Sequence, residues 1–314
     1  MWGGGDVYES FYRLSAKPFS LLPDADFLFL SRRHKMAVNL LEYGMATQAG
    51  FIVISGEVGG GKTTVIRRFL KTAGEDVRVG VINNANKGFG RLLSWVAMAF
   101  EIQHRGRDYA TLYNKFVEFL LEQYAAGRRT VLIIDEAQNF TVEILEELRM
   151  LSNVNNEKDQ LLQIVLAGQP ELLDKLRRPE LRQFVQRIAV HCHLDPLDPG
   201  ETAQYIRHRL GIAGGAPTLF DDTACAAVHF FTGGVPRLIN LLCDLAMVYG
   251  FSDELPRIGI DSVVDAVMDR NRSGLTPFRA VPEGMSGTDL VAQIVAVRDQ
   301  ISAPHEEERH PGKR

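Results

Sequence analysis

A glycine-rich run that ends in lysine and threonine is the clearest chemical signal in the sequence. Residues 56–63 read Gly-Glu-Val-Gly-Gly-Gly-Lys-Thr, which fits the G-x-x-x-x-G-K-[ST] spacing of a phosphate-binding loop. Glycines let backbone N–H groups curl around phosphate oxygens at the start of a helix. A glycine-rich turn with an exposed lysine is the alternative, and the apolar strand before the run and the helical pattern after it argue against that alternative.

The loop residues have distinct expected roles. Lys62 is expected to reach the β and γ phosphates of ATP, and Thr63 to offer its hydroxyl to Mg²⁺, a hard ion that prefers oxygen ligands. The rest of the expected phosphate-binding set consists of Gly56, Gly59, Gly60, Gly61 and Thr64.

Two adjacent carboxylates end a second apolar run, at residues 131–136 with the sequence Val-Leu-Ile-Ile-Asp-Glu. Side chains at the carboxyl ends of parallel strands lie close to a ligand that is bound by the loop after the first strand. Asp135 is therefore expected to hold Mg²⁺ through water, and Glu136 to polarise the water that attacks the γ phosphate. This pair favours hydrolysis over binding alone. An acidic helix start that only complements the helix dipole is the alternative.

Three further polar residues lie where they could assist phosphoryl transfer, which is catalysed by positive charge near the γ oxygens. Arg237 follows Gly-Gly-Val-Pro at the first turn of a predicted helix, and Arg187 precedes the last predicted strand. Gln169 follows the fourth predicted strand, where its amide could orient the attacking water. From spacing alone, each also fits an ordinary surface or turn residue.

Short apolar runs alternate with helical patterns over the first two thirds of the chain. Strands are predicted over residues 51–55, 77–82, 130–135, 162–167 and 188–194, and helices over 31–50, 62–71, 91–101, 109–124 and 142–151. This alternation predicts an α/β fold with a mostly parallel sheet covered on both faces.

Beyond Leu194 the pattern is helical throughout. Helices are predicted over residues 199–210, 221–231, 236–249 and 261–270, after a boundary within residues 194–200 that two prolines stiffen. The expected domains are an N-terminal segment (1–30), an α/β domain (31–196), a small helical domain (197–270) and a mobile tail (271–314). The tail carries one short amphipathic helix, over residues 289–301.

Composition excludes several classes of protein. With 314 residues, 46% of them hydrophobic and 24% charged, and a net charge of −4, the chain is neither disordered nor basic enough overall to steer toward nucleic acid. Its three cysteines stand far apart, which argues against a disulfide framework and a zinc site. Histidines 191 and 193 share one face of a strand without an evident third metal ligand, so a structural role is favoured. The absence of a long apolar run or a secretory signal predicts a cytoplasmic protein.

Together these motifs resemble the AAA+ ATPases, and among them the ExeA/GspA-type secretion ATPases. This group also includes ATPases encoded beside exosortase and exopolysaccharide genes. The matching segments are residues 8–12, 17–19, 29–31 with His34, 50–58, 134–139 (Ile-Asp-Glu-Ala-Gln-Asn), 147–153, 167–172 (Ala-Gly-Gln-Pro-Glu-Leu) and 233–240 (Gly-Gly-Val-Pro-Arg-Leu-Ile-Asn). They span the chain from about Tyr8 to Arg270.

The resemblance implies a P-loop NTPase, an AAA+ module with a five-stranded parallel sheet followed by a small all-helical lid domain. It gives Arg237 the role of the lid arginine, Gln169 that of the polar sensor, and Arg187 that of an arginine finger acting in trans, with Arg182 as the alternative finger. The N-terminal segment would pack near the nucleotide site, with Phe19 and His34 near the adenine. A finger in trans implies a homo-oligomer, expected to be a ring.

Two departures from the family pattern matter. ExeA-type proteins commonly continue past the lid into a membrane span and a peptidoglycan-binding domain, whereas here a short tail follows, so direct contact with peptidoglycan is not expected. A glutamine also stands at the sensor position, where other AAA+ groups more usually have asparagine or threonine.

The leading functional hypothesis is an oligomeric ATPase that assembles or energises an envelope export system for protein or polysaccharide. It would be cytoplasmic or held at the inner membrane by a secretion or export component. The alternative is an ATP-dependent DNA-binding regulator resembling transposon target-selection ATPases, for which Arg67, Arg68, Lys71, Arg177 and Arg178 are available. The acidic overall balance gives DNA binding no support. A nucleotide-gated scaffold without turnover is disfavoured by Glu136.

Overall fold

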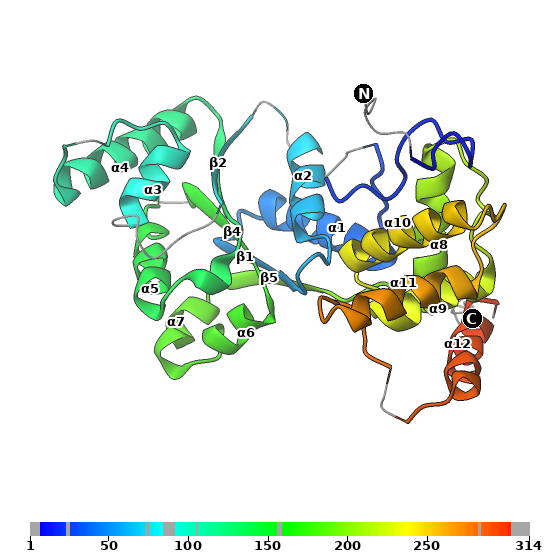
Figure 1. The fold of residues 1–314 in the computed structure, drawn as a ribbon. Coiled ribbons are helices and arrows are strands. Elements are labelled where there is room, and N and C mark those ends of the chain that lie inside the picture. Colours follow the sequence, from blue (N-terminus) through cyan, green and yellow to red (C-terminus); the bar gives the residue numbers. More distant parts are fainter. Residues whose placement is uncertain are drawn as a thin grey trace, which may run out of the picture. The chain divides into compact units, whose positions relative to one another are not determined.

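The chain divides into two compact units in a computed structural model (Figure 1). One unit comprises residues 32–195, and the other comprises residues 1–31 together with 196–314. The structure describes residues 7–22, 26–72, 74, 76–83, 92–104, 106–155, 159–281 and 284–302. The first six residues, Arg91 at the start of a predicted helix, and the charged end at 306–314 lie outside the described residues.

The first unit is built on a five-stranded sheet in which every neighbouring pair is parallel, in the order β2-β3-β4-β1-β5. The strands are β1 (Phe51–Gly56), β2 (Val77–Ile82), β3 (Arg129–Ile134), β4 (Leu162–Gly168) and β5 (Ile188–Leu194). The predicted α/β class with a five-stranded parallel sheet is confirmed, and each predicted strand agrees to within one residue at either end.

The central strands β1 and β4 are buried along their whole length, because helices cover both faces of the sheet. Ile52 and Ile54 face one layer, formed by α1 (Arg32–Ala46) and α2 (Lys62–Thr72). Phe51 and Val53 face the other layer, which includes α3 (Leu92–Ala99), α4 (Tyr109–Ala125) and α5 (Val142–Leu151). Because both faces of these strands are buried, apolar residues such as Val, Ile and Leu are favoured at every position along them.

Three short elements between β4 and β5 escape the sequence patterns. They are α6 (Pro170–Leu176), the 3₁₀ turn η2 (Pro179–Leu181) and α7 (Arg182–Val185). Each is two turns long or less, so it carries too few apolar residues to show a helical period. Their buried side chains, Leu172, Leu181 and Phe184, join the same core as α5.

The second unit is helical, as predicted. It contains α8 (Pro199–Ile212), α9 (Asp222–Thr232), α10 (Pro236–Ser252), α11 (Ile260–Arg272) and α12 (Gly287–Ser302). Asp198 and Glu201 form a capping box at the start of α8. Gly233 ends α9 with a φ of +58°, a left-handed conformation that glycine adopts without strain.

Helix α12 belongs to the core of this unit, where the sequence led us to expect a mobile tail. It packs against α8 and α9, and its Leu290 and Ile294 are buried among residues of those helices. Two apolar residues one turn apart provide enough of a face to dock the helix.

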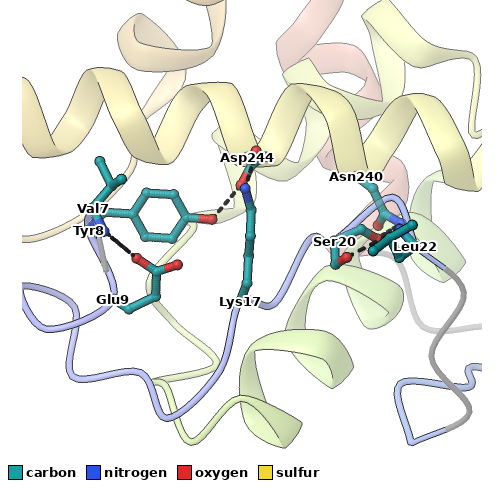
Figure 2. Close-up of polar contacts among 8 residues, drawn as sticks. All are labelled: Val7, Tyr8, Glu9, Lys17, Ser20, Leu22, Asn240 and Asp244. Carbon is teal, nitrogen blue, oxygen red and sulfur yellow. Dashed lines mark hydrogen bonds and ion pairs between the residues drawn. The ribbon is translucent and has the colours of Figure 1, made fainter. Parts of the chain in front are cut away.

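The N-terminal segment, predicted as a separate segment, groups with the helical unit. Its predicted position near the nucleotide site stays a prediction. Figure 2 shows Tyr8 and Lys17 converging on Asp244 of α10. The Tyr8 hydroxyl donates a hydrogen bond to the Asp244 carboxylate, and Lys17 pairs with the same group at 3.0 Å. Burial and this hydrogen bond raise the pKa of Tyr8, which is only 2% exposed.

None of the helices in the described ranges is both long and apolar enough to span a lipid bilayer.

We expect Asp244→Ala to lower the free energy of unfolding of the helical unit by about 1–3 kcal/mol, because the buried Tyr8 hydroxyl loses its acceptor. Lys17→Ala removes only a half-exposed ion pair and should cost less than about 1 kcal/mol. Urea denaturation of both variants measures the difference. Equal losses in the two variants would show that the ion pair, and not the buried tyrosine, fixes the N-terminal segment.

Candidate nucleotide-binding site

The glycine-rich loop joins the end of β1 to the first turn of α2, which begins at Lys62. Gly61 has a φ of +96°, and a Cβ atom at this position would lie 2.3 Å from Nε2 of His34. The loop therefore needs glycine there for its conformation and for space. His34 itself is buried, and its Nε2 lies 3.1 Å from the Gly60 carbonyl oxygen. This histidine therefore packs against the loop and stabilises it. Its predicted place near the adenine stays a prediction.

Lys62 lies inside the loop with its amine satisfied by main-chain oxygens. Its Nζ donates to the carbonyl of Gly56 at 2.7 Å and to that of Glu57 at 2.9 Å. Burial lowers the pKa of Lys62, which is 6% exposed, while the nearby Glu136 and Asp135 carboxylates oppose that shift. An ammonium in contact with carbonyl dipoles alone is well placed to exchange them for phosphate oxygens.

The two predicted metal ligands are neighbours. The hydroxyl of Thr63 donates to Oδ2 of Asp135 at 3.0 Å, and Asp135 directly follows β3. A hydroxyl and a carboxylate are hard oxygen ligands, which Mg²⁺ prefers, and a magnesium site needs few protein ligands because the ion keeps several waters. The residues present therefore fit Mg²⁺, which would neutralise charge on bound phosphates.

Glu136 stands beside Asp135 in an unusual conformation. Its φ and ψ are 57° and 37°, a left-handed geometry that costs energy for any residue with a side chain. Gln138 and Gln169 both donate from Nε2 to Oε2 of Glu136, the latter at 3.2 Å. The predicted sensor glutamine thus contacts the predicted water-activating carboxylate.

Gln138 is a site residue that the sequence reasoning did not single out. Its Oε1 also accepts from the backbone N–H of Gln169 at 3.1 Å, so it ties the end of β4 to the loop after β3. Lys175 of α6 holds the same loop by donating to the carbonyls of Gln138, at 2.6 Å, and Phe140. One feature of the sequence could have pointed to Gln138, namely its place in the family-matching segment at residues 134–139, two residues after Glu136.

Arg187 lies at the opposite edge of the sheet from the loop of its own chain. Strand β5 runs parallel to β1, with Ile188 opposite Phe51 and Leu194 opposite Gly56, so Arg187 precedes the amino end of β5. Its Nη1 donates to the hydroxyl of Ser152 at 3.1 Å. Arg182, the alternative finger, is exposed on α7.

Two of the predicted site residues belong to the helical unit. Arg237 is exposed in the first turn of α10. Phe19 is wholly buried and packs edge-to-face on Phe220, with ring centroids 5.8 Å apart. This packing gives Phe19 a place in the core of the helical unit, and its predicted place near the adenine stays a prediction.

His191 and His193 form a network with Ser55, which precedes the loop. The Ser55 hydroxyl lies 3.1 Å from Nε2 of His191 and 2.8 Å from Nδ1 of His193. Burial first, and then the neighbouring His193 and Arg177, lower the pKa of His191. This geometry agrees with the structural role expected for the pair.

Comparisons with known proteins identify a family. Residues 45–176 match the family described as an AAA domain. Over 247 residues the chain is 39% identical to general secretion pathway protein A of Aeromonas hydrophila, a match that covers 78% of this chain and 45% of that protein. The chain is an AAA+ protein related to general secretion pathway protein A. It spans less than half the length of this relative.

Solved structures share the fold of this AAA+ protein. The crystal structure of Cdc6p from Pyrobaculum aerophilum gives a TM-score of 0.60 at 15% identity, covering 89% of this chain and 84% of that one. The ORC2 protein of Aeropyrum pernix, in its ADPNP and ADP complexes, gives 0.56 at 17% identity, with coverages of 81% and 70%. At such identities the likeness shows the P-loop ATPase fold alone.

Gly61→Ala should weaken nucleotide binding by this AAA+ domain at least about tenfold, because the left-handed φ and the clash with His34 both force the loop to shift. Gly211→Ala in α8 is the matched control, since a Cβ there meets no atom within 4 Å. Titration with a fluorescent ADP analogue measures both. Unchanged affinity in Gly61→Ala would show that the loop does not hold the phosphates.

Proposed function

We propose that this chain binds ATP with Mg²⁺ and hydrolyses it, and that the cycle drives assembly or operation of an envelope system that exports protein or polysaccharide. One observation carries the hydrolytic part of the proposal. The Glu136 carboxylate is held by Gln138 and Gln169 at the sheet edge where Lys62 and Asp135 also lie.

Each group at this edge has a task in hydrolysis. The loop amides and Lys62 bind the phosphates, and Thr63 with Asp135 would hold the metal ion. Glu136 accepts a proton from the attacking water as general base. Gln138 and Gln169 orient that carboxylate, and the Gln169 amide also lies close enough to it to orient the water.

We assign arginines outside this sheet edge to the γ phosphate, where they would stabilise negative charge. Arg187 lies at the far edge of its own sheet, so we assign it to the nucleotide of a second copy, which requires a homo-oligomer and favours a ring. Arg182 is the alternative in this role. Arg237, exposed on α10, is assigned to the nucleotide of its own chain as the lid arginine.

The role in export rests on the relative's name and on the extent of the match. Because the chain spans less than half of that relative, the export partner is proposed only as a class, an inner-membrane secretion or export component. The chain would act on the cytoplasmic side, held at the membrane by that partner. The exposed Arg67, Arg68 and Lys71 of α2 leave DNA as an outcome to be tested rather than a second proposal.

We expect the ATPase rate per subunit to rise steeply with protein concentration, since a finger in trans acts only after assembly. Arg187→Ala should reduce the assembled rate about 10³-fold, whereas Arg298→Ala, a half-buried arginine on α12, should leave it unchanged. Steady-state phosphate release at increasing protein concentration measures both. A wild-type rate in assembled Arg187→Ala would remove the finger assignment.

The same assay with duplex DNA at two salt concentrations separates the two functional hypotheses. The export proposal predicts the same ATPase rate with and without duplex DNA. Stimulation that fades as salt rises would instead indicate phosphate contacts and a DNA transaction.

Gln138→Ala should lower kcat by about tenfold or more, because Glu136 loses one of the two amides that orient it. ATP affinity should stay within about threefold, since Gln138 does not contact the phosphate loop. Gln186→Ala, an exposed glutamine beside Arg187, is the control and should leave kcat unchanged. Equal loss of kcat and of ATP affinity would point to a structural role for Gln138.

A further inference from the structure

Two neighbouring helices of the α/β unit share one outer surface. Helices α1 and α2 cover the same face of the sheet and lie side by side, since the Thr72 hydroxyl of α2 donates to Oε1 of Glu42 on α1 at 3.3 Å. Their apolar residues, among them Leu41, Val65 and Phe69, are buried against the sheet. The exposed residues of the two helices therefore form one outward surface, which we call the α1–α2 face.

Cations dominate the α1–α2 face. Its exposed cationic side chains are Arg32, Arg33, Lys35, Arg67, Arg68 and Lys71. The sequences of the two helices contain one acidic residue, Glu42. Arg33 pairs with Asp195 at 3.1 Å, whereas Lys35 and the three cations of α2 form no ion pair among the described residues. This excess of positive charge is local, because the whole chain has a net charge of −4.

Two large apolar side chains lie among these cations. Met36 is 50% exposed and Tyr43 is 61% exposed. They stand seven residues apart on α1, so the helical repeat places them two turns apart on the side away from the buried Val38 and Leu41. Cations interleaved with a methionine and a tyrosine match a boundary where charged headgroups lie above apolar chains.

We propose that the α1–α2 face docks on a lipid surface rich in anionic phospholipids. The headgroup phosphates attract Lys35 and the cations of α2, and Met36 and Tyr43 enter the boundary between headgroups and acyl chains. Peripheral binding of this kind gains from apolar burial and from electrostatic attraction together. The inference goes beyond the proposed ATPase and does not depend on it.

Two other occupants fit the α1–α2 face less well. Duplex DNA would attract the same cations, but its phosphates and sugars offer Met36 no apolar surroundings. A second copy of the chain, bound symmetrically through this face, would set cations against cations. A lipid surface is the occupant that uses both the charge and the apolar side chains.

Sedimentation of the full chain with sucrose-loaded vesicles, without nucleotide, tests this inference. We expect vesicles of equal parts phosphatidylglycerol and phosphatidylcholine to bind the chain, and phosphatidylcholine vesicles to bind it at least about tenfold more weakly. Salt at about 1 M should remove the difference, because the Debye length falls to about 3 Å. Since no nucleotide is present, failure of the proposed ATPase would leave the result unchanged.

Three variants locate the lipid contact. Arg67→Gln combined with Arg68→Gln should weaken binding to anionic vesicles at least about tenfold, without lowering the melting temperature, since both side chains are exposed. Arg177→Gln combined with Arg178→Gln is the matched control, because it removes the same charge from an exposed pair after α6. Its binding should stay within about threefold of wild type. Tyr43→Ser should weaken binding about threefold and keep the salt dependence.

Three results would overturn the inference. The first is equal binding to both kinds of vesicle, or binding to neither. The second is equal weakening by the two double variants, which would show attraction through net charge instead of through the α1–α2 face. The third is release of the chain from anionic vesicles by duplex DNA at equal phosphate concentration, which would assign this face to nucleic acid.

Discussion

The parallel register of β3, β4 and β1 is the constraint on which the candidate site depends. Ile134, the last residue of β3, lies opposite Leu166, and Ser55 lies opposite Gly168, the last residue of β4. Neighbouring strands therefore end within two residues of one another. Each end carries a different chemical group: the phosphate loop after β1, the Asp135–Glu136 pair after β3, and Gln169 after β4. A shift of register in any one strand would separate groups that must act together.

The site concentrates features that cost stability. Lys62 is buried against carbonyls instead of being paired directly with a carboxylate, and Glu136 holds a left-handed backbone. The central strands around them are apolar and buried, and α4 and α5 begin at the capping side chains of Asp108 and Thr141. Local departures from the preferred conformation at a functional site, supported by a regular surrounding fold, are what a working enzyme requires.

The sequence predicted the sheet and the loop well, because buried parallel strands are short apolar runs and a phosphate loop needs glycine at fixed spacing. It did not predict α6 and α7, which are too short to show a helical repeat of apolar residues. It also did not predict the role of Gln138, because that role depends on the ends of β3 and β4 lying close together in space. It also separated the N-terminal segment and α12 from the helical unit. Their attachment rests on contacts such as Tyr8 with Asp244, between residues far apart in sequence.

The central claim is that Glu136 activates water in a site that holds ATP. The most direct test is to load Glu136→Gln with radiolabelled ATP and follow both retention and cleavage of the nucleotide. Our account predicts that the variant, which keeps an acceptor for Gln138 and Gln169, retains intact ATP without turnover. Turnover at the wild-type rate would contradict it, because another group would then have to activate the water.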